Sequence, residues 1–457
     1  MFAISQDRRR RAGPWAGVIV GNVATACLVL AAAPAGAELA GHGGSVKGVA
    51  ISADGRHAAS ASFDYRLILW DLGAQSEIRD FDEHEGAVNS VAFLPGGARL
   101  VSSSDDGTVR LWDTQSGALL HTFEGHQGKV AAVAVAPNGR LAASAGWDRT
   151  VRLWDLETLA PAGVLEGHKN NVNAVAFSPD GTRLLSGSYD STLKLWSLPD
   201  GNMLRTLTGH DFGVNSLTFT PNGRRAVSAS VDETVRIWDL ENGEETASLV
   251  GHEGPVFGVA VSGDGRLAAS GGVDHTVMLW DLQTATFIRA FYGHQRPVWS
   301  LAFTPDGKRL LSAGSDEVVR LWDLETGTEI GSSGRTQDRI LTAGVSLEAV
   351  AGDPRGAELF RKCAACHTVT ASGARRAGPT LYGLFGRRAG AVGDYKYSEA
   401  LRGMSLIWTE QTVDALFAEG PHSFTPGSKM PLQQMPSAED RAHLISFLKR
   451  ITTPQNE

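Results

Sequence analysis

Cysteine is scarce in this chain, because its 457 residues include only Cys27, Cys363 and Cys366. A zinc site built from two cysteine pairs is excluded, since the closely spaced pair at 363 and 366 has no second pair to complete it. Cys27 lies in a segment that we expect to be removed. No disulfide is therefore available if the remaining two thiols have another use.

The sequence also lacks an apolar run long enough for an ordinary membrane span, which needs about 20 residues. Its longest run, residues 18–33, follows a basic stretch at Arg8 to Arg11 and precedes the small residues 35–37. This order is typical of a signal peptide. We predict a signal peptide over residues 1–37, cleaved after Ala37, and an exported chain that does not span the membrane afterwards. An uncleaved membrane anchor is the alternative.

An excess of positive charge is absent as well. The formal net charge is −8, to which residues 1–37 contribute +3, residues 38–350 contribute −14 and residues 351–457 contribute +3. An acidic middle argues against nucleic acid as a partner, since binding it needs a basic surface. The contrast could instead steer the C-terminal part onto the middle by intramolecular docking.

A repeat with a period of 42 residues fills the middle of the chain. His recurs at positions 42, 84, 126, 168, 210, 252 and 294, and Trp recurs at positions 70, 112, 154, 196, 238, 280 and 322. Gly precedes the His in six copies, and Asp follows the Trp in six. Within each copy, short alternating segments such as 172–177 are followed by turns such as Ser178-Pro179-Asp180-Gly181, which predicts short strands.

These G-H…W-D units resemble the WD-repeat family, in which units of ~40–45 residues each form a four-stranded blade. The resemblance implies an all-β seven-bladed propeller over residues 38–333. It also implies one buried His-Ser-Asp-Trp network per blade. The Ser column is 60, 102, 144, 186, 228, 270 and 312, and the Asp column is 64, 106, 148, 190, 232, 274 and 316. A catalytic Ser-His-Asp triad is rejected, because a nucleophile is not built seven times.

Two variable columns could recognise a partner. The first is the residue before each network Asp, which by resemblance lies on the face that binds partners. The second lies near the start of the innermost strand and consists of Lys47, Asn89, Ala131, Asn173, Asn215, Phe257 and Trp299. Large aromatics in these columns include Trp147, Tyr189, Phe257 and Trp299. They either anchor an interface or pack between blades. The closure of the ring is also left open, because residues 38–40 or residues 328–333 could form the last outer strand.

The stretch Cys363-Ala364-Ala365-Cys366-His367 reads C-x-x-C-H, the pattern for attachment of a c-type haem. Two thiols three residues apart share one side of a helical turn and form thioethers with the haem vinyl groups. The following His then becomes an axial ligand of the iron. A dithiol redox pair is the alternative, but it expects a thioredoxin-like βαβ setting that the neighbouring residues do not supply.

The last hundred residues resemble a class I, mitochondrial-type cytochrome c, a small all-α domain. Asp353-Pro354 suits a helix start, and Ser437 with Asp440 resembles a capping box for a last helix. In this family the two terminal helices cross, with a Gly, here Gly356, against an aromatic, here Phe447. The expected domain covers residues 353–457, after a linker over residues 334–352.

The resemblance also implies a site. Cys363 and Cys366 hold the haem c, and His367 and Met430 ligate its iron. The remaining implied contacts are Pro379, which backs the His, and Arg387, Tyr397 and Trp408, which face the propionates. Rival sixth ligands are Met404, His422 and Met435.

Together these features predict an electron-transfer protein rather than an enzyme. A periplasmic location is expected, because c-type cytochromes as a family receive haem across an energy-coupling membrane. The propeller would serve as a platform on which a redox partner protein docks. The alternative is a propeller-based dehydrogenase whose haem domain accepts the electrons.

Overall fold

The computed structural model describes residues 39–330, 353–364, 367–369, 378–393, 395, 397, 399–426 and 434–453. The predicted signal peptide, the predicted linker, Cys366 and Met430 lie outside these residues. In the described part, no helix combines the length and apolarity that a membrane crossing requires.

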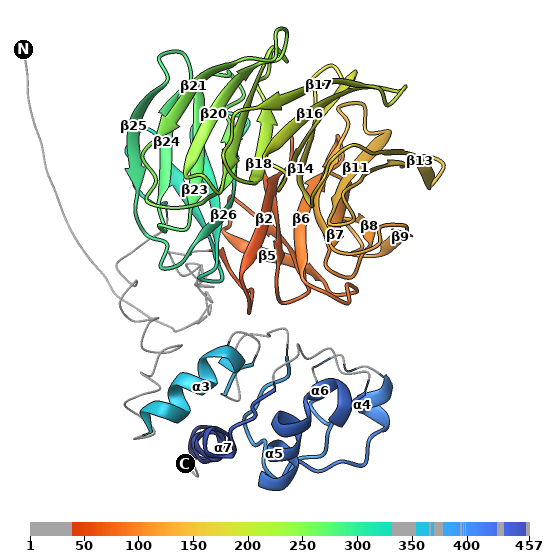
Figure 1. Ribbon diagram of the computed structural model, residues 1–457, viewed down its shortest axis with the longest axis vertical. Helices are drawn as coiled ribbons and strands as arrows, with labels where there is room; N and C mark the ends of the chain where they lie inside the picture. Colours follow the sequence, from red (N-terminus) through yellow and green to blue (C-terminus); the bar gives the residue numbers. More distant parts are fainter. Residues whose placement is uncertain are drawn as a thin grey trace, which may run out of the picture. The chain divides into compact units, whose positions relative to one another are not determined.

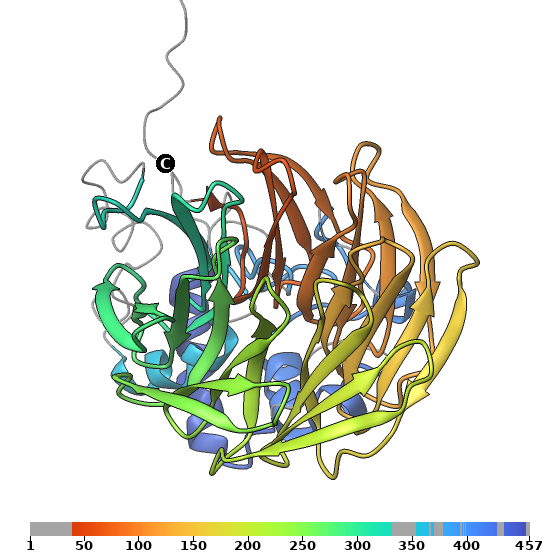
Figure 2. The same ribbon diagram turned by 90° about the horizontal axis from the view of Figure 1, so that it is seen from above.

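Seven antiparallel four-stranded sheets form the blades of a propeller, arranged around a common axis (Figures 1 and 2). Blade 1 consists of β2 Val46–Ile51, β3 His57–Ser62, β4 Leu67–Asp71 and β5 Ser76–Phe81. Blade 2 consists of β6 Val88–Phe93, β7 Arg99–Ser104, β8 Val109–Asp113 and β9 Leu119–Phe123. Blade 3 consists of β10 Val130–Val135, β11 Leu141–Gly146, β12 Val151–Asp155 and β13 Ala160–Leu165. Blades 4 and 5 consist of β14 Val172–Phe177, β15 Arg183–Ser188, β16 Thr192–Ser197 and β17 Met203–Thr208; and β18 Val214–Phe219, β19 Arg225–Ser230, β20 Thr234–Asp239 and β21 Glu245–Val250. Blades 6 and 7 consist of β22 Val256–Val261, β23 Leu267–Gly272, β24 Val277–Asp281 and β25 Thr286–Phe291; and β26 Val298–Phe303, β27 Arg309–Gly314, β28 Val318–Asp323 and β1 Leu39–Ala40. The predicted propeller is confirmed.

The hydrophobic core is divided among the seams between neighbouring blades. At the seam of blades 1 and 2, the outer-strand residue Phe81 packs edge-on against Trp112, with ring centroids 5.5 Å apart. The corresponding residues also pack where Phe123 meets Trp154 and where Phe291 meets Trp322, with the rings tilted rather than edge-on. Each Trp is thus buried by the blade before it, so the blades stabilise one another through apolar area removed from water.

Both candidate segments close the ring. Leu39 and Ala40 pair with Val319 and Val318 at one end of β28, while Glu329 bridges to Trp322 at its other end. Ile330 adds a backbone hydrogen bond of 2.7 Å to the Leu321 carbonyl. The last outer strand is therefore assembled from the two ends of the propeller sequence.

The period of 42 explains this division. The apolar residues at 81, 123, 165, 207, 249 and 291 share one column, in which the C-terminal candidate has Ser333 and the N-terminal one has Leu39. Leu39 is buried in a core cluster with Trp70, as Phe81 is with Trp112. The N-terminal segment thus supplies the apolar side chain that the seventh repeat lacks.

The C-terminal part is helical, as expected. Its helices are α3 Pro354–Ala364, α4 Glu399–Gly403, α5 Glu410–Glu419, α6 Pro421–Phe424 and α7 Ala438–Thr452. Its own core includes buried residues of α3, α5 and α7. The predicted close approach is confirmed, because a Cβ built on Gly356 would lie 2.5 Å from the Cβ of Phe447.

The two terminal helices begin as the sequence suggested, with one difference. Asp353 Oδ1 accepts a hydrogen bond of 2.8 Å from the Gly356 amide and so caps α3. Ser437 caps α7 by accepting from the Asp440 amide at 3.2 Å. The reciprocal half of the predicted capping box is replaced, since the Asp440 carboxylate pairs with Arg355 at 2.8 Å and so ties the start of α7 to α3.

Candidate haem site and interaction surface

The His of the C-x-x-C-H stretch is held at the end of α3. Its backbone amide donates to the Cys363 carbonyl at 2.9 Å, so the His is tied to the last turn of α3. Its imidazole Nδ1 lies 2.7 Å from the Pro379 carbonyl oxygen. A carbonyl can only accept, so Nδ1 carries the proton and the lone pair stays on Nε2. This is the tautomer that a metal-ligating imidazole needs.

Gly378 lets the backbone pass close to this imidazole. A Cβ built on Gly378 would lie 2.6 Å from Nδ1 and 2.8 Å from Nε2 of His367. No real side chain tolerates such contacts, so the approach depends on glycine. Together with the Pro379 carbonyl it fixes the plane of the ring.

The surroundings of the site are apolar. Cys363 is buried in a core cluster with Phe360 and Leu384, and Trp408 packs against the same cluster. A thiol and an oriented imidazole at this spacing, beside an apolar wall, fit a covalently attached haem whose iron takes a nitrogen ligand.

Arg387 and Trp408, two of the predicted propionate contacts, lie on neighbouring segments. The Trp408 amide donates to the Arg387 carbonyl at 2.9 Å, and the Gly386 amide donates to the Trp408 carbonyl at 2.8 Å. Burial lowers the pKa of the Arg387 guanidinium, and the nearby Tyr397 phenol opposes this shift. Tyr397, the third predicted contact, is buried. The structure therefore gathers these three side chains in one region.

The Arg387 guanidinium makes contacts that the sequence did not reveal. Its guanidinium donates to the carbonyls of Thr380 at 2.6 Å and Tyr382 at 2.8 Å. These carbonyls lie one and three residues after Pro379, so Arg387 braces the loop that orients His367. Backbone acceptors leave no trace in the side-chain sequence, which is why this contact was missed.

Among the rival sixth ligands, Met435 is tied to the helical core. Its amide donates to the Phe417 carbonyl at 2.7 Å, and its side chain packs against the core cluster. Met404 is partly buried beside α4. The side chain of His422 lies outside the described residues, as does Met430.

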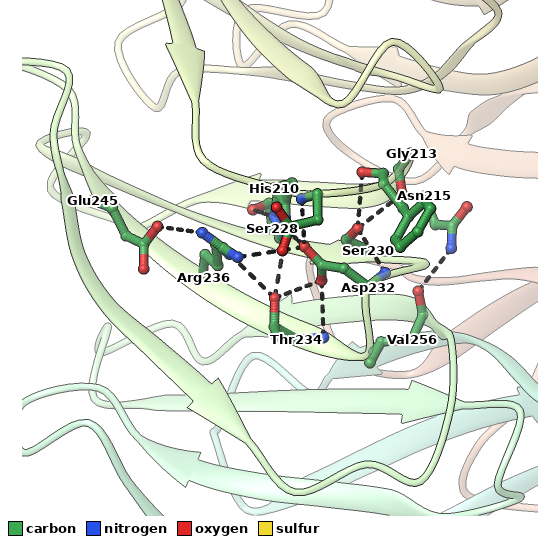
Figure 3. Close-up of polar contacts among 12 residues, drawn as sticks. His210, Gly213, Asn215, Ser228, Ser230, Asp232, Thr234, Arg236, Glu245 and Val256 are labelled. Carbon is green, nitrogen blue, oxygen red and sulfur yellow. Dashed lines mark hydrogen bonds and ion pairs between the residues drawn. The ribbon is translucent and has the colours of Figure 1, made fainter.

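In the propeller, the predicted His-Ser-Asp-Trp network is present in every blade, and Figure 3 shows its His210, Ser228 and Asp232 in blade 5. His210 Nδ1 lies 2.7 Å from Asp232 Oδ2 and Nε2 lies 2.7 Å from Ser228 Oγ, while Trp238 Nε1 donates to the same Oγ at 2.8 Å. Across the seven blades these three distances span 2.7–3.0, 2.7–2.8 and 2.7–2.9 Å. The Ser hydroxyl is buried, donates to the His and accepts from the indole, so it is not available for attack on a substrate.

Burial and charge set the protonation of these networks. Burial raises the pKa of Asp64, but the His42 imidazole and the Arg66 guanidinium outweigh it and hold that pKa at about 2. Burial lowers the pKa of His84 and His126 below the ordinary value, against the pull of their Asp partners. The networks of His84 and His126 therefore favour a carboxylate beside a neutral imidazole.

The four aromatics named above from the variable columns divide into two kinds. Trp147 and Tyr189 are each 42% exposed. Phe257 and Trp299 instead stack on each other, with centroids 4.1 Å apart, and Trp299 Nε1 donates to Ser315 Oγ at 2.6 Å. The first pair is available to a partner, and the second packs between blades. Sequence reasoning missed Phe212, which is 61% exposed in the loop before β18.

Within the described residues, no group of three or more His, Cys, Asp or Glu side chains is placed to hold a metal ion.

The structure is a ring of seven blades, each with the same buried network, followed by a helical domain that orients the His of the C-x-x-C-H stretch. These features define a propeller protein with a c-type haem domain. The protein-family model described as "WD domain, G-beta repeat" matches more than half of the chain, at residues 36–71, 75–113, 117–155, 159–197, 201–239, 243–281 and 285–323. The cytochrome c model matches residues 354–452. The chain belongs to the WD-repeat family and carries a cytochrome c domain at its C-terminus.

Curated relatives match the C-terminal quarter of the chain. Cytochrome c of Ginkgo biloba is 37% identical over 110 residues, which cover 24% of this chain and 96% of the relative. Cytochrome c of Theileria annulata is 38% identical over 104 residues, 22% of this chain and 89% of the relative. Cytochrome c of Sesamum indicum is 40% identical over 108 residues, 23% of this chain and 96% of the relative. These matches imply a covalently bound haem c with its iron and a role in electron transfer, while the propeller suggests protein interaction.

Proposed function

We propose that the chain is an exported periplasmic cytochrome that passes single electrons to or from a redox partner protein. His367 and Met430 ligate the haem iron, and the propeller is the platform on which the partner docks. The observation that carries the proposal is the hydrogen bond of His367 Nδ1 to the Pro379 carbonyl, because it fixes an axial-ligand tautomer next to a thioether cysteine.

The chain's residues divide the work of the haem domain. When bound, the haem supplies the exchange of one electron between ferric and ferrous iron. Cys363 and Cys366 tether it, and Pro379 with Gly378 orients the His367 ring. Because the Pro379 carbonyl accepts from Nδ1, the imidazole is a stronger donor toward the metal.

The axial ligation can be tested by spectroscopy. Met430→Ala should abolish the Met-to-iron charge-transfer band of the oxidised protein. Met435→Ala is the matched control, because that side chain packs against the helical core and its loss should leave the band in place. A band that survives the first change and disappears with the second would assign the ligand to Met435.

Export can be tested on the protein itself. The first described strand, β1, begins at Leu39, two residues after the expected cleavage site. Cleavage after Ala37 would therefore leave the propeller intact. N-terminal sequencing of protein recovered from the periplasm should begin at Glu38. Recovery of the intact N-terminus from membranes would support the uncleaved anchor.

The docking role can be separated from a dehydrogenase by fractionating a periplasmic extract. Reduction of the haem by the protein fraction, lost in a Trp147→Ala, Tyr189→Ala variant with an unchanged haem spectrum, would support docking. Reduction by the dialysable fraction would support a small-molecule dehydrogenase instead.

A further inference from the structure

Lys47 is the one basic residue in the column near the start of the innermost strands. It belongs to β2 of blade 1, and its amine lies 3.0 Å from the centroid of the Trp299 ring of blade 7. Phe257 of blade 6 stacks on the same indole, with the ring planes 13° apart. A hydrogen bond of 2.6 Å from the indole Nε1 to Ser315 Oγ fixes the ring further. Three neighbouring blades therefore hold this amine against an aromatic wall.

The Lys47 amine lacks the carboxylate partner that a buried ammonium needs. Within the part of the chain that the structure describes, no acid forms an ion pair with it. Two charged groups act on it from neighbouring blades: the carboxylate of Asp105 favours its cation, and the amine of Lys129 opposes it. The Asp105 oxygens are already engaged, because they accept from Lys129 Nζ at 2.5 Å and from Asn89 Nδ2 at 2.8 Å. The position therefore stabilises the ammonium of Lys47 poorly.

The protonation of Lys47 follows from this setting. Burial lowers the pKa of the Lys47 amine from 10.5 to about 7, with a smaller opposing effect of Asp105. The face of an indole attracts a cation, but it does not replace the hydrogen-bond acceptors that an ammonium loses when it leaves water. The side chain is half-buried rather than enclosed, so small molecules can reach it. Lys47 thus combines a deprotonated amine with access from solvent.

We propose that Lys47 is a covalent modification site for small uncharged aldehydes, which it holds reversibly as imines. The neutral amine attacks the carbonyl carbon and forms the C–N bond, while a proton passes from the nitrogen to the oxygen through solvent. The resulting carbinolamine loses water as its C–O bond breaks, so the imine forms without any oxidation or reduction. An uncharged aldehyde suits this site, because a charged one would have to lose its own hydration beside the aromatic wall.

The test uses the full-length haem-loaded protein with propanal and sodium cyanoborohydride at neutral pH. The reductant converts each imine into a stable secondary amine, and peptide mass spectrometry measures the rate of propylation at every lysine. Lys47 should react at least about tenfold faster than the exposed Lys169 and Lys308, because ordinary lysines with a pKa of ~10.4 are almost entirely protonated under these conditions. This preference should shrink as the pH is raised toward ~10.4. Equal rates at neutral pH, or a slower rate at Lys47, would overturn the proposal.

One substitution separates the reactivity of Lys47 from mere access to it. Trp299→Ala would open the site to water, which should raise the pKa of the amine toward its ordinary value and slow propylation at neutral pH by about tenfold. A lysine limited only by access would react faster in this variant. Trp147→Ala is the matched control, because it removes an indole 5.0 Å from the Lys129 amine and should leave the rate at Lys47 unchanged. A rate that stays the same or rises in the Trp299 variant, or that falls equally in the control, would refute the assignment.

If the Trp299 variant fails to fold, the comparison of Lys47 with Lys308 in the wild-type protein still decides the question. That comparison depends neither on the haem nor on a docked partner. A protein that exchanges electrons but shows no preferential modification of Lys47 would lose only this inference.

Discussion

At the scale of single residues, each blade depends on a hydroxyl that serves two neighbours. Ser228→Ala would leave both the Trp238 indole N–H and the His210 Nε2 without their partner in a buried site. We expect the free energy of unfolding of the propeller to fall by about 1–3 kcal/mol. Ser248→Ala, an exposed position on β21 of the same blade, is the control and should change little. Chemical denaturation followed by circular dichroism measures both, and equal effects would contradict the role of the network.

The same networks predict how stability depends on pH. His84 and His126 have pKa values below 6.5 when folded, because burial disfavours the charged imidazole. Their contribution is complete above 6.5 and declines as the pH falls below it, because the unfolded chain then binds more protons. Asp64 adds a second loss as the pH falls from 3.8 toward about 2. Denaturation midpoints of the propeller should therefore decrease in two stages on acidification. A midpoint that rises between neutral pH and pH values below 6.5 would contradict this.

At the scale of elements, the strand β1 has only two residues but contributes strongly to the stability of the propeller. Leu39→Ser should lower the stability of the propeller by about 2–5 kcal/mol, because Leu39 is buried in the seam with Trp70. Val250→Ser, 72% exposed at the end of β21, is the matched control. Intrinsic fluorescence during denaturation reports the difference. A wild-type midpoint in the Leu39 variant would mean that Glu329 and Ile330 suffice to close the ring.

The crossing of α3 and α7 makes a similar prediction for the helical domain. Gly356→Ala would place a Cβ 2.5 Å from Phe447 Cβ and 2.8 Å from the His443 carbonyl oxygen. We expect overpacking to cost about 1–3 kcal/mol, more than the ~1 kcal/mol that Ala gains over Gly in a helix. Gly403→Ala, in α4 with open space around it, should be neutral or stabilising. The change in the haem absorbance spectrum on unfolding in denaturant measures both, and similar midpoints for the two variants would contradict the crossing.

Which features of the fold could be predicted from the sequence also depends on scale. The repeat predicted the blades, because the same buried network recurs with each period of 42. The division of the closing strand was also readable in principle, since Leu39 and not Ser333 continues the apolar column. The split among the aromatics was not, because the stack of Phe257, Trp299 and Lys47 joins residues up to 252 positions apart in the sequence.

The haem site could be predicted from the sequence only in part. The spacing of Cys363, Cys366 and His367 follows from the chemistry of attachment, and the structure adds the Pro379 carbonyl that orients the ring. The brace from Arg387 to the Thr380 and Tyr382 carbonyls could not be predicted, because it depends on how the backbone folds back.

At the scale of the whole molecule, the two parts have separate hydrophobic cores. Those of the propeller are drawn from residues 39–330, and that of the helical part from residues after 353. Deletion of residues 351–457 should therefore leave a soluble, colourless propeller with the circular dichroism of a β protein. The full-length chain is the control. A truncated product that still shows haem absorbance would contradict the division.

The bipartite outer strand of blade 7 has a consequence for biogenesis. During synthesis, Leu39 is made before the rest of the propeller, but its pairing partner Val319 in β28 follows only with the seventh repeat. The ring of blades therefore cannot close until the last repeat has been made, and the segment that is made first pairs last. A chain stalled before the seventh repeat would expose an apolar side of the unfinished propeller to chaperones and proteases. The complete chain can close the ring by pairing β1 with β28.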